Sequence, residues 1–262
     1  RAAAEQLAPV TLEMGGKSPA IVDATAPLAQ VAKRLAWGKG LNAGQVCIAP
    51  DYLLVEASVE ADLVSAVVSR WKQCFTGDTL NSKEYGRIVN EEQFQRLKDT
   101  LDDALSKGAQ ILHGGKHDAA ALFMEPTILG NVTLDMRVMQ EEVFGPLLPI
   151  LTWNDPLAVS KTISEVKDQP LSMYIFSRDK GRRRQWMKHT RSGTVGIGET
   201  VVQIANPDLP FGGVQASGLG RSNGKAAFDA CPTRRSVLRK TLPFTAVALS
   251  RAPLDPATTA SD

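Results

Sequence analysis

The sequence predicts an α/β fold that contains at least one parallel strand–helix–strand unit. Short apolar runs alternate along the chain with longer segments of helical periodicity, the pattern of a layered α/β domain. The composition is that of a globular protein, because 43% of the residues are hydrophobic and 22% are charged. The 262 residues are enough for one large or two small domains that bury a core without disulfides.

The first predicted elements are two strands, each followed by a helix. Residues 19–22 and 52–55 are apolar runs of the length of a buried strand. Residues 27–39 follow the first run and begin with a proline, which helices accept in their first turn. The helix after the second run has one apolar face, made of Leu63, Val67, Val68 and Trp71. Another amphipathic helix ends before Gly108 and carries Phe94, Leu97, Leu101 and Leu105.

The second half of the chain repeats this pattern. Residues 147–153 and 171–177 are apolar enough to be buried strands, and a helix around 159–166 joins them. Such a connection is normally right-handed and its strands parallel. A basic helix is expected over 181–190, whereas the glycine and proline content of 194–220 predicts loops.

The two ends of the chain are less regular. The first dozen residues predict a helix remnant and a strand at 10–12, for which no earlier partner stands in the sequence. Residues 234–239 predict a late strand, and the tail 244–262 is expected to be disordered. The first residue is Arg1 and not Met, so we expect a piece of a longer gene product.

Charge, hydropathy and cysteine content exclude several classes of protein. Lys and Arg number 30 against 28 Asp and Glu, so the charge predicts no nucleic-acid or acidic-membrane partner. No apolar run approaches the roughly 20 residues of a membrane helix. Three scattered cysteines cannot frame a disulfide-rich secreted domain, which favours a reducing, cytoplasmic location.

Cys47 is the first residue that could carry chemistry. It lies in a loop of small residues, 42–50, where Gly44 allows main-chain N–H groups to approach a ligand closely. A thiol in such a loop can have its pKa lowered and act as a nucleophile. The alternative is a small buried hydrophobe, the usual role of an isolated cysteine.

Glu13 is a candidate general base. It follows a predicted strand and precedes two glycines, Gly15 and Gly16, so its carboxylate could reach water in a cleft. The alternative is an ordinary surface glutamate, alone or paired with Lys17.

Glu142 and Phe144 stand at a turn that enters a predicted strand. A carboxylate there can accept hydrogen bonds from the hydroxyls of a sugar, and the ring can pack on a flat ligand. Ordinary capping acids are the alternative. The glycine-dense loop 209–220 lacks the GxGxxG fingerprint, and its spacing alone indicates a tight connection.

No metal or nucleic-acid site is predicted. His113 and His117 are separated by two glycines, which prevent a helix from aligning them, and no cysteine joins them at finger spacing. The basic run 178–191 indicates a solvated helix face, because the chain offers no aromatic platforms or basic domain. Cys74 and Cys231 match no functional motif.

Four segments occur together in an order that resembles the aldehyde dehydrogenase superfamily. They are Leu12-Glu13-Met14-Gly15-Gly16-Lys17-Ser18-Pro19, Gly44-Gln45-Val46-Cys47, Glu142-Val143-Phe144-Gly145-Pro146 and Pro210-Phe211-Gly212-Gly213. Residues 47–52, 169–174 and 234–237 resemble the class-3 branch. The opening residues 1–13 are most similar to bacterial coniferyl aldehyde dehydrogenases.

The resemblance implies a role for each matched residue. Cys47 would attack the aldehyde, with its own N–H holding the oxyanion, and Glu13 would activate the water that hydrolyses the thioester. Glu142 would hold the nicotinamide ribose, Phe144 would pack near the nicotinamide, and Gly15 would contact the cofactor. The implied reaction is the NAD- or NADP-dependent oxidation of an aldehyde, with coniferyl aldehyde as a candidate, to a free acid. Members that acylate coenzyme A generally lack this glutamate.

The resemblance also implies the organisation of the chain. Residues 14–220 would form a catalytic domain with a twisted, mostly parallel sheet and flanking helices. Residues 1–13 would end the cofactor-binding domain, and 221–243 would add a helix and a strand with a role in a homodimer. The nucleotide-binding domain and one asparagine of the oxyanion hole lie upstream in the family. We therefore expect this chain alone to be inactive.

Three departures from the class-3 pattern leave the aldehyde open, namely Gly198, Gln215 and Asn223. Two other functions also remain open. One is a cofactor-free thiol esterase that uses Cys47 and Glu13, and the other is a non-catalytic assembly module.

Overall fold

The computed structural model describes residues 1–166, 169–233 and 235–239 in two units, Arg1–Ala230 and Cys231–Asp262. All helices and strands of the described residues belong to the first unit. Residues 235–239 form no strand, so the strand predicted over 234–239 is wrong at these positions. A strand needs a hydrogen-bonded neighbour, and none of the described strands pairs with this segment. Position 234 and the predicted disordered tail, 244–262, lie outside the described residues.

Seven strands form one sheet in the order β10-β9-β2-β3-β8-β7-β4. All neighbouring strands in it are parallel except β7 and β4, which run antiparallel. The predicted α/β fold with a mostly parallel sheet is therefore confirmed. The strands are β2 (Pro19–Val22), β3 (Tyr52–Glu56), β4 (Gln110–His113), β7 (Thr127–Gly130), β8 (Leu147–Trp153), β9 (Ser172–Phe176) and β10 (Thr194–Ile197).

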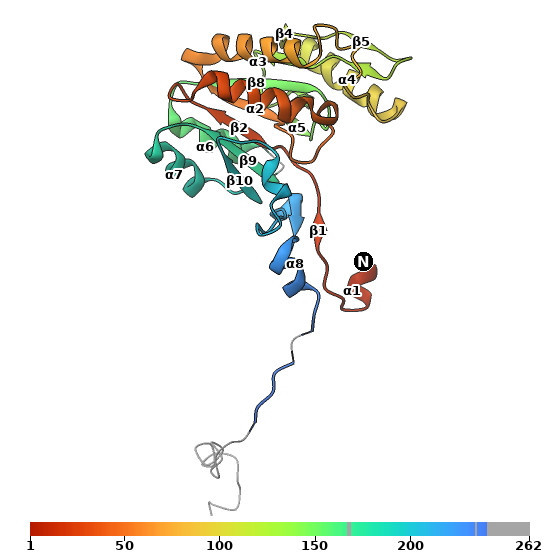
Figure 1. The fold of residues 1–262 in the computed structure, drawn as a ribbon, viewed down its shortest axis with the longest axis vertical. Coiled ribbons are helices and arrows are strands. Elements are labelled where there is room, and N and C mark those ends of the chain that lie inside the picture. Colours follow the sequence, from red (N-terminus) through yellow and green to blue (C-terminus); the bar gives the residue numbers. More distant parts are fainter. Residues whose placement is uncertain (167–168, 234, 240–262) are drawn as a thin grey trace, which may run out of the picture. The chain divides into compact units, whose positions relative to one another are not determined.

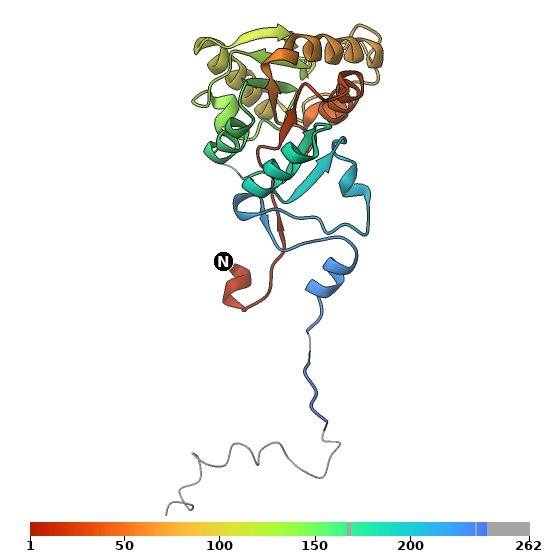
Figure 2. The same ribbon diagram turned by 90° about the vertical axis from the view of Figure 1, so that its left-hand side faces the viewer.

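Helices cover both faces of this sheet (Figure 1, Figure 2). The chain passes from β2 to β3 through α2, and from β8 back to β9 through α6, in the opposite direction across the sheet. Because such crossovers are right-handed, α2 and α6 lie on opposite faces. Helix α3 packs against α2, α7 against α6, and α5 against α4. The bounds are α2 (Leu28–Gly40), α3 (Glu60–Cys74), α4 (Glu91–Ser106), α5 (Arg137–Gln140), α6 (Pro156–Glu165) and α7 (Lys180–His189).

Local sequence explains where the later helices begin. Asn90, Asp155 and Asp179 each precede a helix and accept a main-chain N–H from its first turn. Pro156 occupies the first position of α6, where a missing N–H leaves no bond unmade. None of the described helices has the length and apolar character needed to cross a bilayer.

Two short strands bring distant parts of the sequence together. β1 (Leu12–Glu13) pairs antiparallel with β11 (Gly218–Leu219), so the partner of the predicted strand at 10–12 comes later in the chain. The remaining elements are α1 (Ala2–Glu5), β5 (His117–Asp118), β6 (Phe123–Met124), α8 (Gly224–Ala230) and short 3₁₀ turns at Leu41–Gly44, Ala57–Val59, Val202–Ala205 and Gln215–Ser217. Helix α8 confirms the helix predicted within 221–243.

The prediction of loops throughout 194–220 is wrong at its start. Residues 194–197 form β10, which is hydrogen-bonded in parallel to β9 at the edge of the sheet. Two of its four residues are exposed, and one of the others is Gly196, so the segment lacks the apolar run that marks a buried strand. Its strand conformation follows from pairing with β9 rather than from local preference.

Candidate active site

The candidate residues lie on loops that precede neighbouring parallel strands. Gly15 comes before β2, Cys47 before β3, and Glu142 and Phe144 before β8. Because β2, β3 and β8 are adjacent and run in the same direction, their amino ends meet at one edge of the sheet. The topology therefore gathers three of the segments that sequence analysis singled out.

The Cys47 loop has an unusual backbone before the cysteine. Asn42, Ala43 and Gly44 all have positive φ, at 50°, 53° and 75°. A Cβ on Gly44 would overlap the main-chain carbonyl of Gly145, so the glycine lets the cysteine loop pack directly on the backbone next to Phe144. The side-chain amide of Gln45 donates to the carbonyl oxygens of Asn42 and Arg87, each at 2.9 Å. The loop that contains Cys47 therefore packs on the main chain of Gly145 and is hydrogen-bonded to the main-chain carbonyl of Arg87.

The Cys47 thiol is partly buried beside a small apolar cluster formed by Ile48, Leu171, Val201 and Phe211. Burial raises the pKa of the Cys47 thiol, and the negative charges of Glu142 and Glu13 raise it further. The main-chain N–H groups of Cys47 and Ile48 act against this rise in pKa by favouring the thiolate. The lowered pKa expected from the loop alone is therefore wrong, because nearby carboxylates and desolvation outweigh these donors.

Glu142 and Gly15 are in direct contact. A Cβ on Gly15 would occupy the position of the Glu142 carboxylate, so only glycine leaves room for this acid. Burial, and after it the charge of Asp51, raise the pKa of Glu142 to about 7. The main-chain N–H of Gly16 and the ammonium groups of Lys17 and Lys39 oppose the rise. This carboxyl is therefore poised to exchange a proton, or to accept hydrogen bonds, near neutral pH.

Phe144 stands two residues after this carboxyl in the same loop. Its side chain is 40% exposed and its backbone has φ of 43°, which is rare for an aromatic residue. The preceding Val143 is fixed from two directions: its N–H donates to Asp51 Oδ2 at 2.9 Å, and its carbonyl accepts from Arg96 Nη2 at 2.7 Å. The neighbouring bonds hold the strained backbone that directs the ring outward.

Glu13 lies on β1, exposed, and its carboxylate accepts a hydrogen bond from the Ser222 hydroxyl. The alternative pairing with Lys17 is wrong, because Lys17 is completely buried and forms its ion pair with Asp51. Glu13 stands two residues before Gly15, and its charge is one of the causes that raise the pKa of the Cys47 thiol. Of the five candidates, Cys47, Glu13, Glu142 and Gly15 thus form one group, and Phe144 adjoins it.

Sequence reasoning missed the buried charges beneath the site. The Lys17 ammonium donates to the carbonyls of Val138 at 2.8 Å and Glu141 at 3.0 Å besides its bond to Asp51. Lys39 is also buried, and desolvation lowers its pKa to about 8. The signal in the sequence is the position of Lys17, which follows two glycines and precedes a Ser-Pro pair. Only the fold shows that its partner stands 34 positions later.

The other sequence candidates lie in ordinary structural settings. In the basic run, Arg182 forms ion pairs with Asp23 and Glu56, and Trp186 is fully buried and unable to stack on a base. Within the described residues no group of three or more His, Cys, Asp or Glu is arranged to hold a metal ion. Cys74 and Cys231 are exposed and unbonded to other cysteines.

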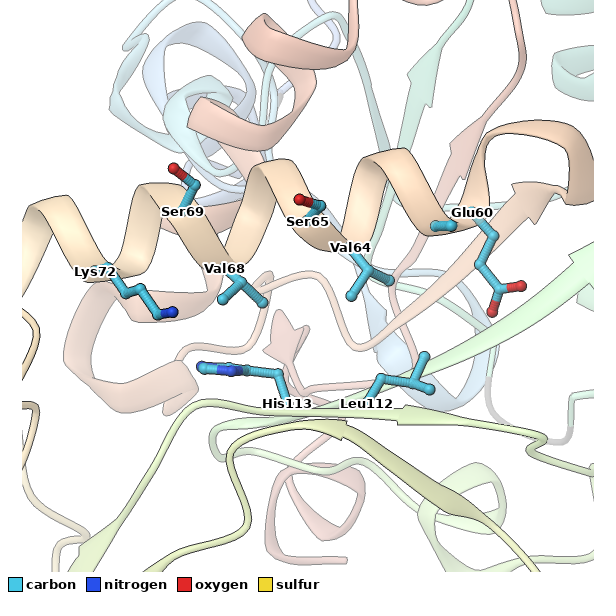
Figure 3. A pocket seen from close by; sticks show the side chains of 9 residues that line it. Glu60, Val64, Ser65, Val68, Ser69, Lys72, Leu112 and His113 are labelled. Carbon is cyan, nitrogen blue, oxygen red and sulfur yellow. The ribbon is translucent and has the colours of Figure 1, made fainter.

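A separate groove of 610 Å³ lies between α3 and β4, with His113 and Leu112 facing the helix (Figure 3). None of the five predicted site residues lines this groove.

Comparisons with known proteins agree with this geometry. The family model described as the aldehyde dehydrogenase family matches residues 1–237. The protein named probable coniferyl aldehyde dehydrogenase from Pseudomonas aeruginosa is 41% identical over 250 residues, covering 92% of this chain and 50% of that protein. Mouse aldehyde dehydrogenase family 3 member A2 is 41% identical over 243 residues, covering 92% of this chain and 49% of that protein.

Among solved structures, the substrate-bound state of Staphylococcus aureus AldH superimposes with a TM-score of 0.87 at 42% identity, covering 93% of this chain and 52% of that one. The chain spans about half the length of the curated relatives it matches. The similarity to class-3 and coniferyl aldehyde dehydrogenases is therefore confirmed. The family model extends over most of the chain, and the chain belongs to the aldehyde dehydrogenase family.

Proposed function

We propose that this chain carries the nucleophile, the general base and the nicotinamide-facing residues of an NAD(P)-dependent aldehyde oxidation. The observation that carries the proposal is geometric: the loops that hold Gly15, Cys47 and Glu142 precede the adjacent parallel strands β2, β3 and β8, and the Glu142 carboxylate lies against Gly15. A thiol and two carboxylates with separate environments are the groups that acyl chemistry on sulfur requires.

The reaction begins with attack by Cys47 Sγ on the aldehyde carbon. The thiol proton passes to solvent water, and the new oxyanion accepts a hydrogen bond from the Cys47 N–H. A nicotinamide held by Glu142 and Phe144 would supply the hydride acceptor for this adduct, and loss of the hydride from the former aldehyde carbon would leave a thioester on Cys47. Glu13 then removes a proton from water, the hydroxide adds to the thioester carbon, and the acid departs as sulfur regains a proton.

The residues present fit a nicotinamide nucleotide. Gly15 leaves space for the Glu142 carboxylate, which is buried enough to form strong hydrogen bonds with ribose hydroxyls. The exposed ring of Phe144 offers an apolar surface to the flat nicotinamide. The proposal covers both NAD and NADP, because these residues would face the part of the cofactor that the two share.

The proposed substrate class is an aromatic or α,β-unsaturated aldehyde of the coniferyl type. The Pseudomonas aeruginosa relative supports it by its name and by 41% identity. The proposed assembly is a homodimer in the cytoplasm. Oxidation rates over a panel of aryl, fatty and small aldehydes would test the substrate class, and a preference for fatty aldehydes would contradict it.

Acyl transfer from a p-nitrophenyl ester tests the two catalytic roles within this chain. Cys47→Ala should abolish the burst of nitrophenol, whereas Cys74→Ala should keep it. Glu13→Gln should retain the burst but slow the steady phase about 10²-fold or more, the usual contribution of a general base. Glu5→Gln, an exposed carboxylate in α1, is the matched control. A burst that survives Cys47→Ala would contradict the proposal.

Cofactor-free ester hydrolysis is the second candidate function. One observation favours it, namely that the thiol and the base lie in the same described unit. Following nicotinamide reduction by absorbance, with an aldehyde and NAD⁺ or NADP⁺, separates the two functions. Ester turnover without any nicotinamide binding or reduction would support the esterase.

A further inference from the structure

Tyr174 connects two loops that adjoin Cys47. It lies in the middle of β9 and is completely buried. Its hydroxyl donates to the carbonyl of Ile48, the residue after the nucleophile. The same hydroxyl accepts from the main-chain N–H of Val201 at 3.3 Å and from Gln203 Nε2 at 3.2 Å. One phenol thus joins the Cys47 loop to the segment 201–203.

The hydrogen bonds of this phenol have a fixed direction. A tyrosine hydroxyl has one proton and two acceptor positions. Both acceptor positions are filled by N–H donors from Val201 and Gln203, so the proton points to the Ile48 carbonyl. Gln203 Nε2 is itself oriented by the hydroxyl of Ser172, 3.1 Å away. The network therefore fixes the direction of the hydrogen bond from the Tyr174 hydroxyl to the Ile48 carbonyl.

Ile48 is the residue through which this bond can act on the nucleophile. Its N–H is one of two main-chain donors that favour the Cys47 thiolate. Its side chain is completely buried in the apolar cluster, and the N–H of Ala49 closes a turn on the Val46 carbonyl at 2.9 Å. The carbonyl and the N–H of Ile48 lie in adjoining peptide planes that meet at its Cα. With the carbonyl, the side chain and the Ala49 turn all held, the backbone torsions of Ile48 are restricted, and so is the direction of its N–H.

The second segment joined by Tyr174 is strained. Val201 has φ of 65° and ψ of −40°, and the N–H of Val202 donates to the Thr200 carbonyl at 2.6 Å, which makes a γ-turn of the rare kind. A β-branched residue at positive φ is a true outlier and persists only where surrounding contacts enforce it. The Val201 side chain, 5% exposed, packs in the same cluster as Cys47. The hydroxyl of Tyr174 is therefore bonded to both backbones that form the wall beside the thiol.

We propose that Tyr174 is a positioning residue for the Cys47 nucleophile, acting through the Ile48 carbonyl, with Gln203 orienting its hydroxyl. The inference rests on the proposed function of Cys47. Tyr174 itself does not touch the reacting atoms in this scheme. Its contribution is to keep the Ile48 N–H aimed at sulfur, so that the thiolate forms at lower pH than it would in a loose loop.

Alkylation of Cys47 by iodoacetamide across pH tests the inference in the full chain, with Cys74→Ser and Cys231→Ser leaving a single thiol. Tyr174→Phe keeps the ring but removes the hydroxyl. We expect its alkylation profile to move to higher pH by about half to one unit, or about three- to ten-fold slower alkylation below the pKa. The charged groups that act on this thiol are Glu142 and Glu13, and Tyr174→Phe changes neither of them.

Tyr85→Phe is the matched control. Tyr85 is also buried, and its hydroxyl donates to a main-chain carbonyl, that of Met124, at 2.9 Å, which belongs to neither of the two segments that Tyr174 joins. General loss of stability would affect both variants, whereas positioning predicts a shift for Tyr174→Phe alone. An unchanged profile for Tyr174→Phe, or an equal shift for Tyr85→Phe, would overturn the inference.

A second variant keeps the test decisive if Tyr174→Phe does not fold. Gln203→Met removes the donor without adding charge and lies on a partly exposed turn. It should shift the profile in the same direction by a smaller amount, and no shift would overturn the inference. These outcomes are separate from a failure of the proposed function, which would show itself as aldehyde oxidation or ester acylation that survives Cys47→Ala.

Discussion

Glu142→Gln should make the chain more stable at neutral and alkaline pH. The pKa of Glu142 is raised from its ordinary 4.5 to about 7, first by burial and then by the charge of Asp51. Between these pH values the folded protein keeps a proton that the unfolded chain has released, so stability falls as pH rises through this window. A shift of about two and a half units corresponds to at most about 3 kcal/mol. Glutamine cannot ionise and avoids this cost.

Urea unfolding, followed by fluorescence of the buried tryptophans, measures the effect between pH 4.5 and 7.5. The two proteins should be about equally stable at the acid end, and the variant should gain progressively above pH 5. Glu141→Gln is the control, because Glu141 is the next residue, is 42% exposed and pairs with Arg137 on the surface. The free energy of unfolding of Glu141→Gln should stay within about 0.5 kcal/mol of the wild-type value. A pH-independent gain for Glu142→Gln, or a loss that grows with pH, would refute the reasoning.

Two further predictions concern the packing around the site. Lys17→Met leaves the Asp51 carboxylate buried without its ion pair, so urea unfolding should show a loss of about 3–5 kcal/mol, much of it recovered by adding Asp51→Asn. If the stability losses of the two single variants simply added in the double variant, the result would contradict a buried ion pair between Lys17 and Asp51. Gly44→Ala places a Cβ on the Gly145 carbonyl at φ of 75°, whereas Gly77→Ala, at φ of 79°, meets open space. Thermal melts should show the first variant less stable by at least about 1 kcal/mol, and equal melts would contradict the packing of the two loops.

The central strands and helices could be predicted because local pattern and tertiary environment agree there. Strands such as β2 and β9 are buried along their whole length and therefore read as continuous apolar runs. The edge strands differ. β4 has three exposed residues out of four, and β10 contains a glycine, so neither shows a buried pattern. Their pairing comes from a neighbouring strand that local sequence does not reveal.

The candidate residues of the site could be predicted from the sequence, but the residues that hold their loops in place could not. Cys47 and Glu142 stand in short motifs whose residue types suit their chemistry, and the topology brings the motifs together. The partners of Tyr174 and Lys17 could not be predicted, because each lies far away in sequence, 126 positions for Tyr174 and Ile48 and 34 for Lys17 and Asp51. The pKa of Cys47 was mispredicted for the same reason, since the carboxylates that raise it belong to other loops.

The glycines of these motifs carry a packing requirement that accounts for much of the pattern. A Cβ on Gly15 would displace the Glu142 carboxylate, one on Gly44 would overlap the Gly145 carbonyl, and one on Gly16 would lie 2.7 Å from the Gln169 carbonyl. The Gly44 and Gly16 contacts join loops that precede neighbouring parallel strands and let these loops approach within backbone contact, and the Gly15 contact joins the loop before β2 to the loop before β8. The candidate residues Cys47, Glu142 and Phe144 are carried by these closely packed loops. For this reason the motifs are short, glycine-rich and dispersed along the sequence: each supplies one loop of a shared wall, and the chemistry depends on all of the loops being close at once.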